Sequence, residues 1–312
     1  MEEKIRVKKE RIPPKRGGKR TLAPLGAGAM LTKYKLVLAE TDPRMQELAD
    51  EHECVYLAMV APTLASAAGI EVTDTPLISD DEVIEFDYVV ASIKERTKKP
   101  LDLYLAMETP GGLPAAAFKI ARLLRNSFNK ITVLVPFTSY SAGTLIALIA
   151  DEIVMGPVSN LGPLDVQVPG SEGVYVSGSA FRKAFEWMEQ IQKEQKCDTS
   201  LDAMLKWIDP IMLRSFEDLQ KASELYLRQV LTEAHYGPTE VQAIVSALVW
   251  DLPTHEFAIM RERAKELGVR VRYSEDFPEW SIIKDWVLRL MFVGKNDHVL
   301  SYVLWDEIGR LT

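Results

Sequence analysis

Residues 101–112 read Leu-Asp-Leu-Tyr-Leu-Ala-Met-Glu-Thr-Pro-Gly-Gly, and this stretch decides the fold. Its first seven residues form a short apolar run, which predicts a buried strand. The segment from Glu108 to Gly112 predicts a turn. Residues 113–128 then place apolar side chains at helical spacing. The stretch therefore predicts a strand that passes through a glycine-rich turn into a helix.

The same alternation continues on both sides of this unit. Further apolar runs predict strands at 54–60, 131–136 and 152–155, and helices are predicted at 43–51, from 79 to about 97, and at 141–150. Ser79 and Glu82 form the capping box that begins the second of these helices. Continuous apolar strands that alternate with helices predict an α/β fold with a mostly parallel sheet covered on both faces.

The second half of the chain is predicted to be mostly helical. Helical segments are expected at 181–196 and 201–234, and a mixed unit at 239–273 ends in a strand at 269–273. The tail from Pro278 is expected to be helical and to pack on a neighbour. The predicted organisation is a basic arm (1–35), an α/β domain (36–275) and a C-terminal helical extension (276–312).

The composition is that of a soluble globular protein. Of the 312 residues, 47% are hydrophobic and 26% charged, and the net charge of −8 argues against a nucleic-acid binder. Residues 1–20 hold nine Lys/Arg against three Glu, so this arm carries +6 and the rest of the chain −14. The arm is interpreted as flexible and solvated. The alternative is an electrostatic tether to acidic lipid, nucleic acid or an acidic partner.

The cysteines and the apolar runs predict the compartment. Cys54 and Cys197 suggest neither a disulfide framework nor a metal site, so no metal and no cofactor are expected. The apolar run at 21–31 is broken by Pro24 and two glycines, and it is too short to span a bilayer. The protein is therefore expected to be cytoplasmic.

The turn Thr109-Pro-Gly-Gly112 is the first motif that points to chemistry. Paired glycines let backbone amides point outward without obstruction by side chains. The helix that follows adds the positive end of its dipole. Gly111 and Gly112 would therefore suit an anion or an oxyanion. Taken alone, the motif is explained as well by a plain strand-to-helix turn.

The second motif is Phe-Thr-Ser-Tyr-Ser-Ala-Gly-Thr at 137–144, which also joins a strand to a helix. Ser141 would stand at the helix N-terminus with the small residues Ala142 and Gly143 behind it. Small neighbours let the backbone turn sharply and leave the hydroxyl exposed, as a nucleophile elbow requires. The amide of Ala142 would point at the same space. The alternative is that Ser141 is an ordinary N-cap.

The two motifs support one another. They follow neighbouring parallel strands, so both lie at the carboxyl edge of the sheet, where such sheets bind ligands. One motif can supply the nucleophile and the other the oxyanion donors, which is what acyl transfer requires.

Several segments together resemble a known family. They are Thr109–Gly112, Val135-Pro136, Ser141–Leu148, Ala150–Gly156 and Leu161–Gln167, with Thr254-His255 and Ala264–Gly268 farther on. In this order and spacing they resemble the serine dehydrogenase proteinase family of Clp-fold serine proteinases, relatives of signal peptide peptidase A and the Clp proteolytic subunits. The resemblance implies a Clp/crotonase-type fold with repeated β-β-α units, a peptidase that acts on peptides or proteins, and a homo-oligomer.

The resemblance also implies roles for individual residues. Ser141 would be the nucleophile, and Gly112, with Gly111, and Ala142 would offer the oxyanion amides. Three positions depart from the family pattern: Glu108 stands where histidine is expected, Tyr140 where methionine is expected, and Val166 where proline is expected. Residues 170–179 also differ from the pattern. These changes indicate diverged activity or specificity.

The general base is not assigned by the sequence. The Clp subunits carry a histidine in the region where this chain has Asp165, which is interpreted as an orienting residue or as a partner of the adjacent turn. The membrane-protease relatives use a lysine farther on, and here Lys183 is the nearest candidate base and Lys193 the second. None of His52, His235, His255 and His298 has a motif-level claim. His255 matches the resemblance but falls in a unit interpreted as structural.

Three functions remain open at this point. The leading hypothesis is a serine peptidase, ATP-independent in itself because the chain carries no Walker-type Gly-Lys-Ser/Thr motif. The second is a catalytically inactive oligomeric scaffold or peptide-binding pseudo-enzyme of the same fold. The third is acyl-CoA chemistry, in which the paired amides polarise a thioester carbonyl and no serine nucleophile is needed.

Overall fold

The computed structural model describes residues 42–64, 76–97, 99–169, 175–194, 210–292 and 298–304. The chain divides into two compact units, residues 1–35 and 36–312, and every described residue lies in the second. The predicted basic arm, Cys197 and the first part of the helix predicted at 201–234 lie outside the described residues. Within the described ranges, no helix combines the length and the apolar character that crossing a bilayer would need.

A six-stranded sheet forms the centre of the second unit, in the order β10-β5-β3-β2-β1-β11. The strands are β1 (Val55–Val60), β2 (Leu103–Glu108), β3 (Ile131–Val135), β5 (Glu152–Met155), β10 (Val271–Tyr273) and β11 (Val299–Leu304). All neighbours pair in parallel except β11, which is antiparallel to β1. The four strands predicted between residues 54 and 155 are confirmed, as is the mostly parallel α/β class.

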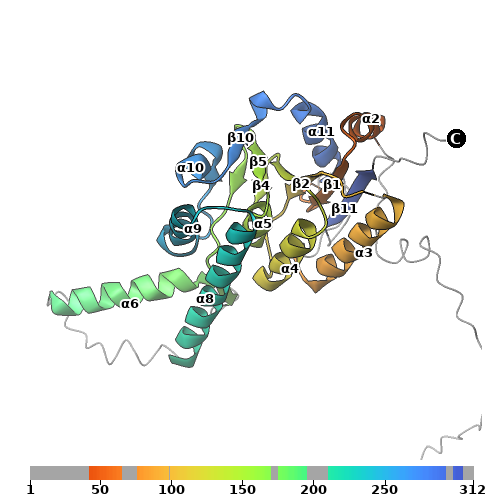
Figure 1. Ribbon diagram of the computed structural model, residues 1–312. Helices are drawn as coiled ribbons and strands as arrows, with labels where there is room; N and C mark the ends of the chain where they lie inside the picture. Colours follow the sequence, from red (N-terminus) through yellow and green to blue (C-terminus); the bar gives the residue numbers. More distant parts are fainter. Residues whose placement is uncertain are drawn as a thin grey trace, which may run out of the picture. The chain divides into compact units, whose positions relative to one another are not determined.

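Helices cover both faces of this sheet, as Figure 1 shows. One face carries α3 (Asp80–Arg96), α4 (Pro114–Arg125) and α5 (Ala142–Ala147), and the other carries α2 (Pro43–His52) and α11 (Trp280–Leu290). The predicted capping box begins α3, because the Glu82 carboxylate accepts from the Ser79 amide and the Ser79 hydroxyl accepts from Asp81. The core against α2 and α11 includes Tyr56 of β1 and Trp286 of α11.

A second, three-stranded sheet runs beside the carboxyl edge of the main sheet. It consists of β4 (Thr138–Ser139), β6 (Asn160–Leu161) and β9 (Ile259–Met260), in the order β4-β6-β9. After β2, Thr109 bridges in parallel to Ser139 of β4. The unit β3-β4-α5 shows the repeat well, since a long strand is followed by a short strand in the second sheet and then by a helix. This is the predicted β-β-α pattern.

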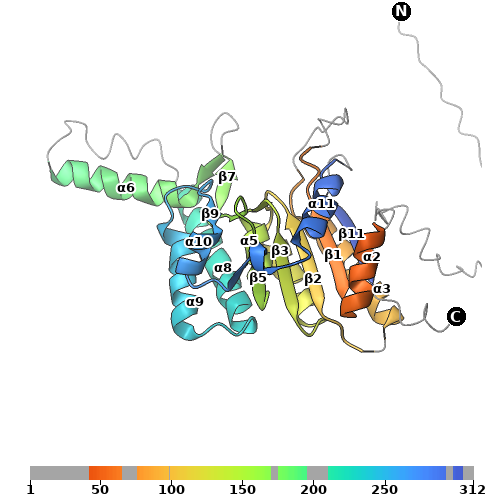
Figure 2. The ribbon, with the colours of Figure 1, turned by 90° about the horizontal axis from the view of Figure 1, so that it is seen from above.

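The remaining elements are mostly helical, as predicted. They are β7 (Gln167–Pro169), β8 (Tyr175–Ser177), α6 (Gly178–Lys193), α8 (Pro210–Glu233), α9 (Pro238–Val245), the π-helix η3 (Ser246–Asp251), α10 (Arg261–Glu266) and η4 (Ser274–Asp276). Figure 2 shows α8, α9 and α10 gathered on the β10 side of the main sheet. Residues 252–258 connect η3 to β9 and so lead into the second sheet.

The C-terminal tail differs from its prediction. Residues 280–290 are helical as expected, but residues 299–304 form β11 instead of continuing the helix. All six residues of β11 pair with all six residues of β1, which fills an edge that would otherwise present unpaired backbone groups. The prediction of an all-helical tail was therefore wrong. The tail completes the main sheet of its own chain.

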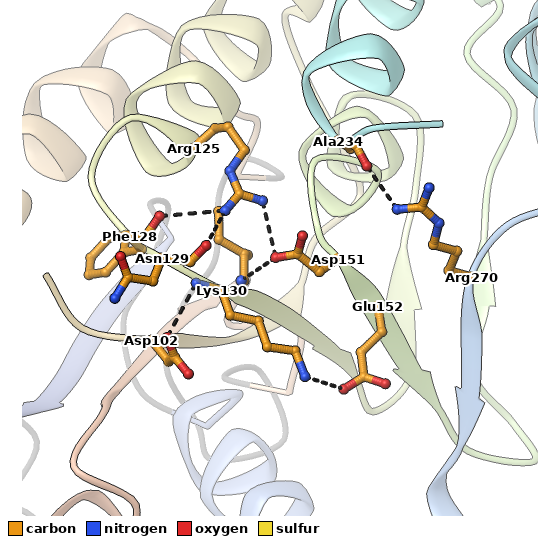
Figure 3. Close-up of polar contacts among 10 residues, drawn as sticks. Asp102, Arg125, Phe128, Asn129, Lys130, Asp151, Glu152, Ala234 and Arg270 are labelled. Carbon is orange, nitrogen blue, oxygen red and sulfur yellow. Dashed lines mark hydrogen bonds and ion pairs between the residues drawn. The ribbon is translucent and has the colours of Figure 1, made fainter. Parts of the chain in front are cut away.

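Polar contacts close the amino edge of the main sheet (Figure 3). One Asp151 carboxylate oxygen accepts from the Ile131 amide at 2.7 Å and from the Arg125 guanidinium at 3.1 Å. Lys130 reaches Glu152 at 3.4 Å. These bonds tie the end of α4 to the starts of β3 and β5. Asp151 lies in one of the segments that resemble the family. Its carboxylate has a structural role at the edge of the sheet opposite the glycine turn.

Candidate active site

Ser141 has a strained backbone and an unused side chain. It stands between β4 and α5 with φ 50° and ψ −117°. L-residues avoid this conformation, and such outliers cost about 1–3 kcal/mol each. Ser141 occupies the N-cap position of α5, yet its side chain makes no capping hydrogen bond, and the residue is half-buried. A strained serine between a strand and a helix, whose hydroxyl does not cap the helix, has the backbone of a nucleophile elbow.

Small residues and one threonine hold the elbow in place. A Cβ on Gly143 would lie 2.5 Å from Thr109 Cγ2, and a Cβ on Gly162 would lie 2.0 Å from the Tyr140 ring. The buried Thr144 hydroxyl donates to the Ser139 carbonyl at 2.7 Å and accepts from the Gly162 amide at 3.0 Å. The start of α5 is therefore locked to the segment that follows β6.

The glycine turn packs directly against this elbow. Gly111 has φ 102°, and a Cβ there would lie 2.9 Å from Ser141 Cβ and 2.7 Å from the Tyr140 carbonyl oxygen. Gly112 lies against the backbone of Ile78 on its other side, where a Cβ would be 2.3 Å from the Ile78 nitrogen. The two motifs recognised in the sequence therefore meet in space, and each glycine is required by a close backbone approach.

Two backbone amides at this place have no hydrogen-bond partner among the described residues. The Leu113 amide donates to Ile78 at 2.7 Å, so in the extended turn the amide of Gly112 points to the opposite side. Within the described residues, no hydrogen bond is recorded for the amides of Gly112 or Ala142. The Gly111 amide, in contrast, donates to the Thr109 hydroxyl at 3.1 Å. Of the three predicted oxyanion donors, the geometry leaves Gly112 and Ala142 free.

The fit of Gly112 gives a stability prediction. Gly112→Ala should lower the free energy of unfolding by about 3 kcal/mol, because its Cβ meets backbone atoms that cannot swing aside. Gly268→Ala is the matched control, since Gly268 also has a positive φ (92°) but nothing within 4 Å of its Cβ position. That variant should lose only about 1–2 kcal/mol from backbone strain. Urea unfolding of both variants checks the difference, and equal losses would contradict the close packing.

A buried carboxylate and a histidine form a hydrogen-bonded pair near the elbow. Asp165 Oδ1 lies 2.7 Å from His255 Nδ1, and the Ser177 hydroxyl donates to the other oxygen of Asp165. The side chain of Asp165 is 5% exposed and that of His255 20%. A carboxylate held this way fixes the imidazole orientation and keeps the proton on Nδ1. Asp165 thus has the geometry of the orienting residue that the sequence proposed, and its partner is His255.

The second sheet brings this pair to the same edge as Ser141. Strands β4 and β6 are parallel, and β6 and β9 are antiparallel. Ser141 follows β4, Asp165 follows β6 and His255 precedes β9, so all three lie at one end of the sheet. The residues next to Ser141 and His255 support this placement, because burial and the negative charge of Glu256 both raise the pKa of Tyr140. Glu256 is next to His255, and Tyr140 is next to Ser141.

Helix α8 and the π-helix η3 support the pair from behind. The buried Gln220 accepts from the Val166 amide at 2.8 Å and donates to the Val249 carbonyl. The Leu164 amide donates to the Leu248 carbonyl at 2.8 Å. Both residues that flank Asp165 are therefore tied to η3, the element that precedes the His255 segment. Single π-helical turns are frequent at functional sites.

The two lysines considered as bases are hydrogen-bonded or ion-paired to other groups. Lys183 on α6 is half-buried, and its Nζ donates to the Leu252 carbonyl at 3.2 Å. Lys193 is exposed and pairs with Glu189 at 3.6 Å. In the part of the chain that the structure describes, no three His, Cys, Asp or Glu side chains are grouped to hold a metal ion.

Two relatives of this chain come from Methanocaldococcus jannaschii. The protein named "Uncharacterized protein MJ0137" is 30% identical over 229 residues, 73% of this chain and 71% of the relative. "Uncharacterized protein MJ1495" is 29% identical over 175 residues, 56% of this chain. The match spans about half the length of MJ1495, 53%.

Among solved structures, two variants of a membrane-bound stomatin-specific protease, 1510-N, are similar to this chain. The serine-to-alanine variant has a TM-score of 0.43 and 17% identity, over 67% of this chain and 80% of the other. The lysine-to-alanine variant, in complex with a substrate peptide, has a TM-score of 0.42 and 17% identity, over 67% and 79%.

A family model covers most of the chain. The model described as ClpP-like SDH-type serine proteinase matches residues 29–281, which include both motifs, Asp165 and His255. The resemblance recognised in the sequence is thereby confirmed, and with it the ClpP-like α/β fold and the general class of serine peptidase. This chain belongs to the ClpP-like SDH-type serine proteinase family.

Proposed function

We propose that this chain hydrolyses peptide bonds through an acyl-enzyme on Ser141, with His255 as the general base and Asp165 as its orienting partner. The observation that carries the proposal is the strained Ser141 with its uncapped hydroxyl, at the same sheet end as the Asp165–His255 pair. Strain that persists in a folded protein is typical of functional sites. His255 takes the place that the sequence analysis gave to Lys183.

The proposed steps follow from these contacts. Asp165 accepts from Nδ1, so the Nε2 atom of His255 keeps a lone pair that can take the proton of the Ser141 hydroxyl. The serine oxygen attacks the substrate carbonyl carbon, and the amides of Gly112 and Ala142 stabilise the resulting oxyanion. His255 then protonates the leaving amine, and water releases the acyl group by the reverse sequence of proton transfers.

The finer features of the proposal are the substrate, the nucleotide requirement and the assembly. We include peptide or protein substrates, and hydrolysis without ATP, which the lack of a Walker motif in the 312 residues supports. We also include a homo-oligomer, supported by large apolar side chains left exposed on the helices, such as Trp187 on α6 (60% exposed). Analytical ultracentrifugation tests the assembly independently of activity.

Active-site labelling tests the central claim. A fluorophosphonate probe should label the parent protein and fail to label Ser141→Ala, because only an activated serine reacts. Ser127→Ala is the control, since the Ser127 hydroxyl donates to the Leu123 carbonyl far from the turn and should not affect labelling. A folded parent that takes up no probe would contradict the proposal and favour the inactive scaffold.

A further inference from the structure

A buried hydrogen-bonded chain of side chains lies behind the glycine turn. The Thr109 hydroxyl is 2.8 Å from His298 Nε2, and His298 Nδ1 is 3.1 Å from Glu82 Oε1. The side chains of His298 and Glu82 are 0% and 7% exposed. Thr109 is 189 residues from His298 in sequence, and Glu82 is 216 residues away. A local capping box does not need such a distant partner.

The chain of contacts closes into a ring around the turn. The second oxygen of Glu82 accepts from both the amide and the hydroxyl of Ser79 at 2.7 Å. The neighbouring Ile78 donates its amide to the Gly111 carbonyl at 2.8 Å. The Gly111 amide in turn donates to the Thr109 hydroxyl at 3.1 Å. Both polar groups of the Gly111 residue are therefore held, one from each side of the ring.

The ionisation of Glu82 sets the direction of these hydrogen bonds. Burial alone would raise its pKa, but hydrogen bonds from His298 and Ser79 lower the pKa of Glu82 to about 2. An ionised carboxylate only accepts, so His298 donates from Nδ1. On the other side of the ring, Nε2 is hydrogen-bonded to the Thr109 hydroxyl, and a lone pair of that hydroxyl accepts from the Gly111 amide. The Gly111 amide and His298 Nδ1 thus each have a defined acceptor, the Thr109 hydroxyl and the Glu82 carboxylate.

The main sheet explains why His298 reaches this place. Val299 of β11 pairs with Val60 of β1, and Val60 pairs with Glu108 of β2. His298 precedes β11 and therefore lies at the carboxyl ends of β1 and β2, within hydrogen-bond distance of Thr109. The ring is built at the edge that carries the glycine turn, and nothing in the proposed acyl-transfer steps uses it.

We propose that Thr109, His298 and Glu82 are positioning residues that aim the oxyanion amide. The Ile78 amide binds the Gly111 carbonyl, which shares a peptide plane with the Gly112 amide, and the Thr109 hydroxyl binds the Gly111 amide in the preceding plane. With both planes held by the ring, the Gly112 amide is turned toward Ser141. The inference rests on the proposed function of Ser141 and Gly112. A donor aimed at the oxyanion acts in the transition state, so the ring should affect kcat and leave KM nearly unchanged.

Substitutions at Thr109 test this role directly. Thr109→Val keeps the shape of the side chain and removes the hydroxyl, and we expect kcat to fall about 10- to 100-fold, since loss of a whole oxyanion donor costs about 10²- to 10³-fold. Thr109→Ser keeps the hydroxyl and should recover most of the rate. A Thr109→Val variant with parental kcat, or a Thr109→Ser variant as poor as Thr109→Val, would overturn the inference.

Histidine substitutions test whether His298 acts through Thr109. His298→Gln should lower kcat in the parent but have little further effect in Thr109→Val, because residues that act as a unit are not additive. His52→Gln is the control, since His52 contacts Glu279 at 3.3 Å outside the ring and should leave kcat unchanged. Independent, multiplicative losses at Thr109 and His298 would contradict a shared role.

Amide hydrogen exchange separates this inference from the proposed function. Exchange of the 109–113 segment, followed by mass spectrometry, should accelerate in Thr109→Val and His298→Gln but not in Thr109→Ser or His52→Gln. If the parent neither reacts with the probe nor hydrolyses peptides, the proposed function fails and exchange alone decides whether the ring holds the turn. Unchanged exchange in Thr109→Val would overturn the inference in either case, even if the variant is less stable.

Discussion

Replacing His255 by alanine should reduce kcat for peptide hydrolysis by about 10³- to 10⁴-fold, while the protein still folds. A positioned general base contributes up to about 10⁴-fold, and loss of the orienting carboxylate has a comparable effect in serine peptidases. Asp165→Asn should therefore fall in the same range, because the neutral amide lacks the charge that stabilises an imidazolium and its NH₂ group can donate to Nδ1, which favours the wrong tautomer of His255. Steady-state kinetics on a fluorogenic peptide measures both losses.

Lysine and serine variants make this test specific. Lys183→Gln should retain near-parental kcat, since its Nζ bonds a carbonyl and takes no part in the proposed proton transfer. In the Ser141→Ala background, His255→Ala should cause almost no further loss, because a base without its nucleophile has nothing to activate. A large loss in Lys183→Gln together with an active His255→Ala variant would return the role of base to the lysine.

Glu108→Gln should stabilise the protein by an amount that grows as the pH rises above 4.5. Glu108 is 5% exposed at the end of β2, and burial raises its pKa from 4.5 to about 7, against a hydrogen bond from the Thr138 amide. Between pH 4.5 and 7 the folded state holds a proton that the unfolded state has released. The parent therefore loses stability as pH rises through this window.

The size of this effect follows from the shift. At 1.36 kcal/mol per pKa unit, ionisation of Glu108 costs up to about 3 kcal/mol at pH 8. Glutamine keeps an oxygen for the Thr138 amide and never ionises, so the variant should be more stable than the parent by up to that amount at pH 8 and similar to it at pH 4.5. Guanidinium unfolding at both pH values measures the difference. Parallel pH profiles would show that Glu108 is not neutral in the folded protein.

Much of the fold could be predicted because its signals are local. Strands β1, β2, β3 and β5 are buried on both faces, so each appears as a continuous apolar run. The capping box at Ser79 marked the start of α3 within a single turn. Strand β11 could not be predicted in this way, because its conformation depends on pairing with β1, far away in the sequence.

In the candidate site, too, the residues with local sequence signals could be predicted and those placed by distant pairings could not. Ser141 and the glycines are recognisable because each motif combines nucleophile or donor with its own strand-to-helix turn. His255 joins Asp165 across 90 residues only through the pairing of β6 with β9, strands of two residues each. The available signal was Thr254-His255 within the family resemblance. Similarly, the sequence revealed one partner of Glu82 and not the other, His298.

The place of β11 in the sheet determines when the sheet can be completed as the chain is synthesised. On the ribosome, β1 emerges more than two hundred residues before β11, which covers its outer edge, so a nascent chain presents a six-residue edge able to join another chain. The same late segment delivers His298 to the glycine turn. Protection of the edge and completion of the turn therefore arrive together, when β11 pairs with β1.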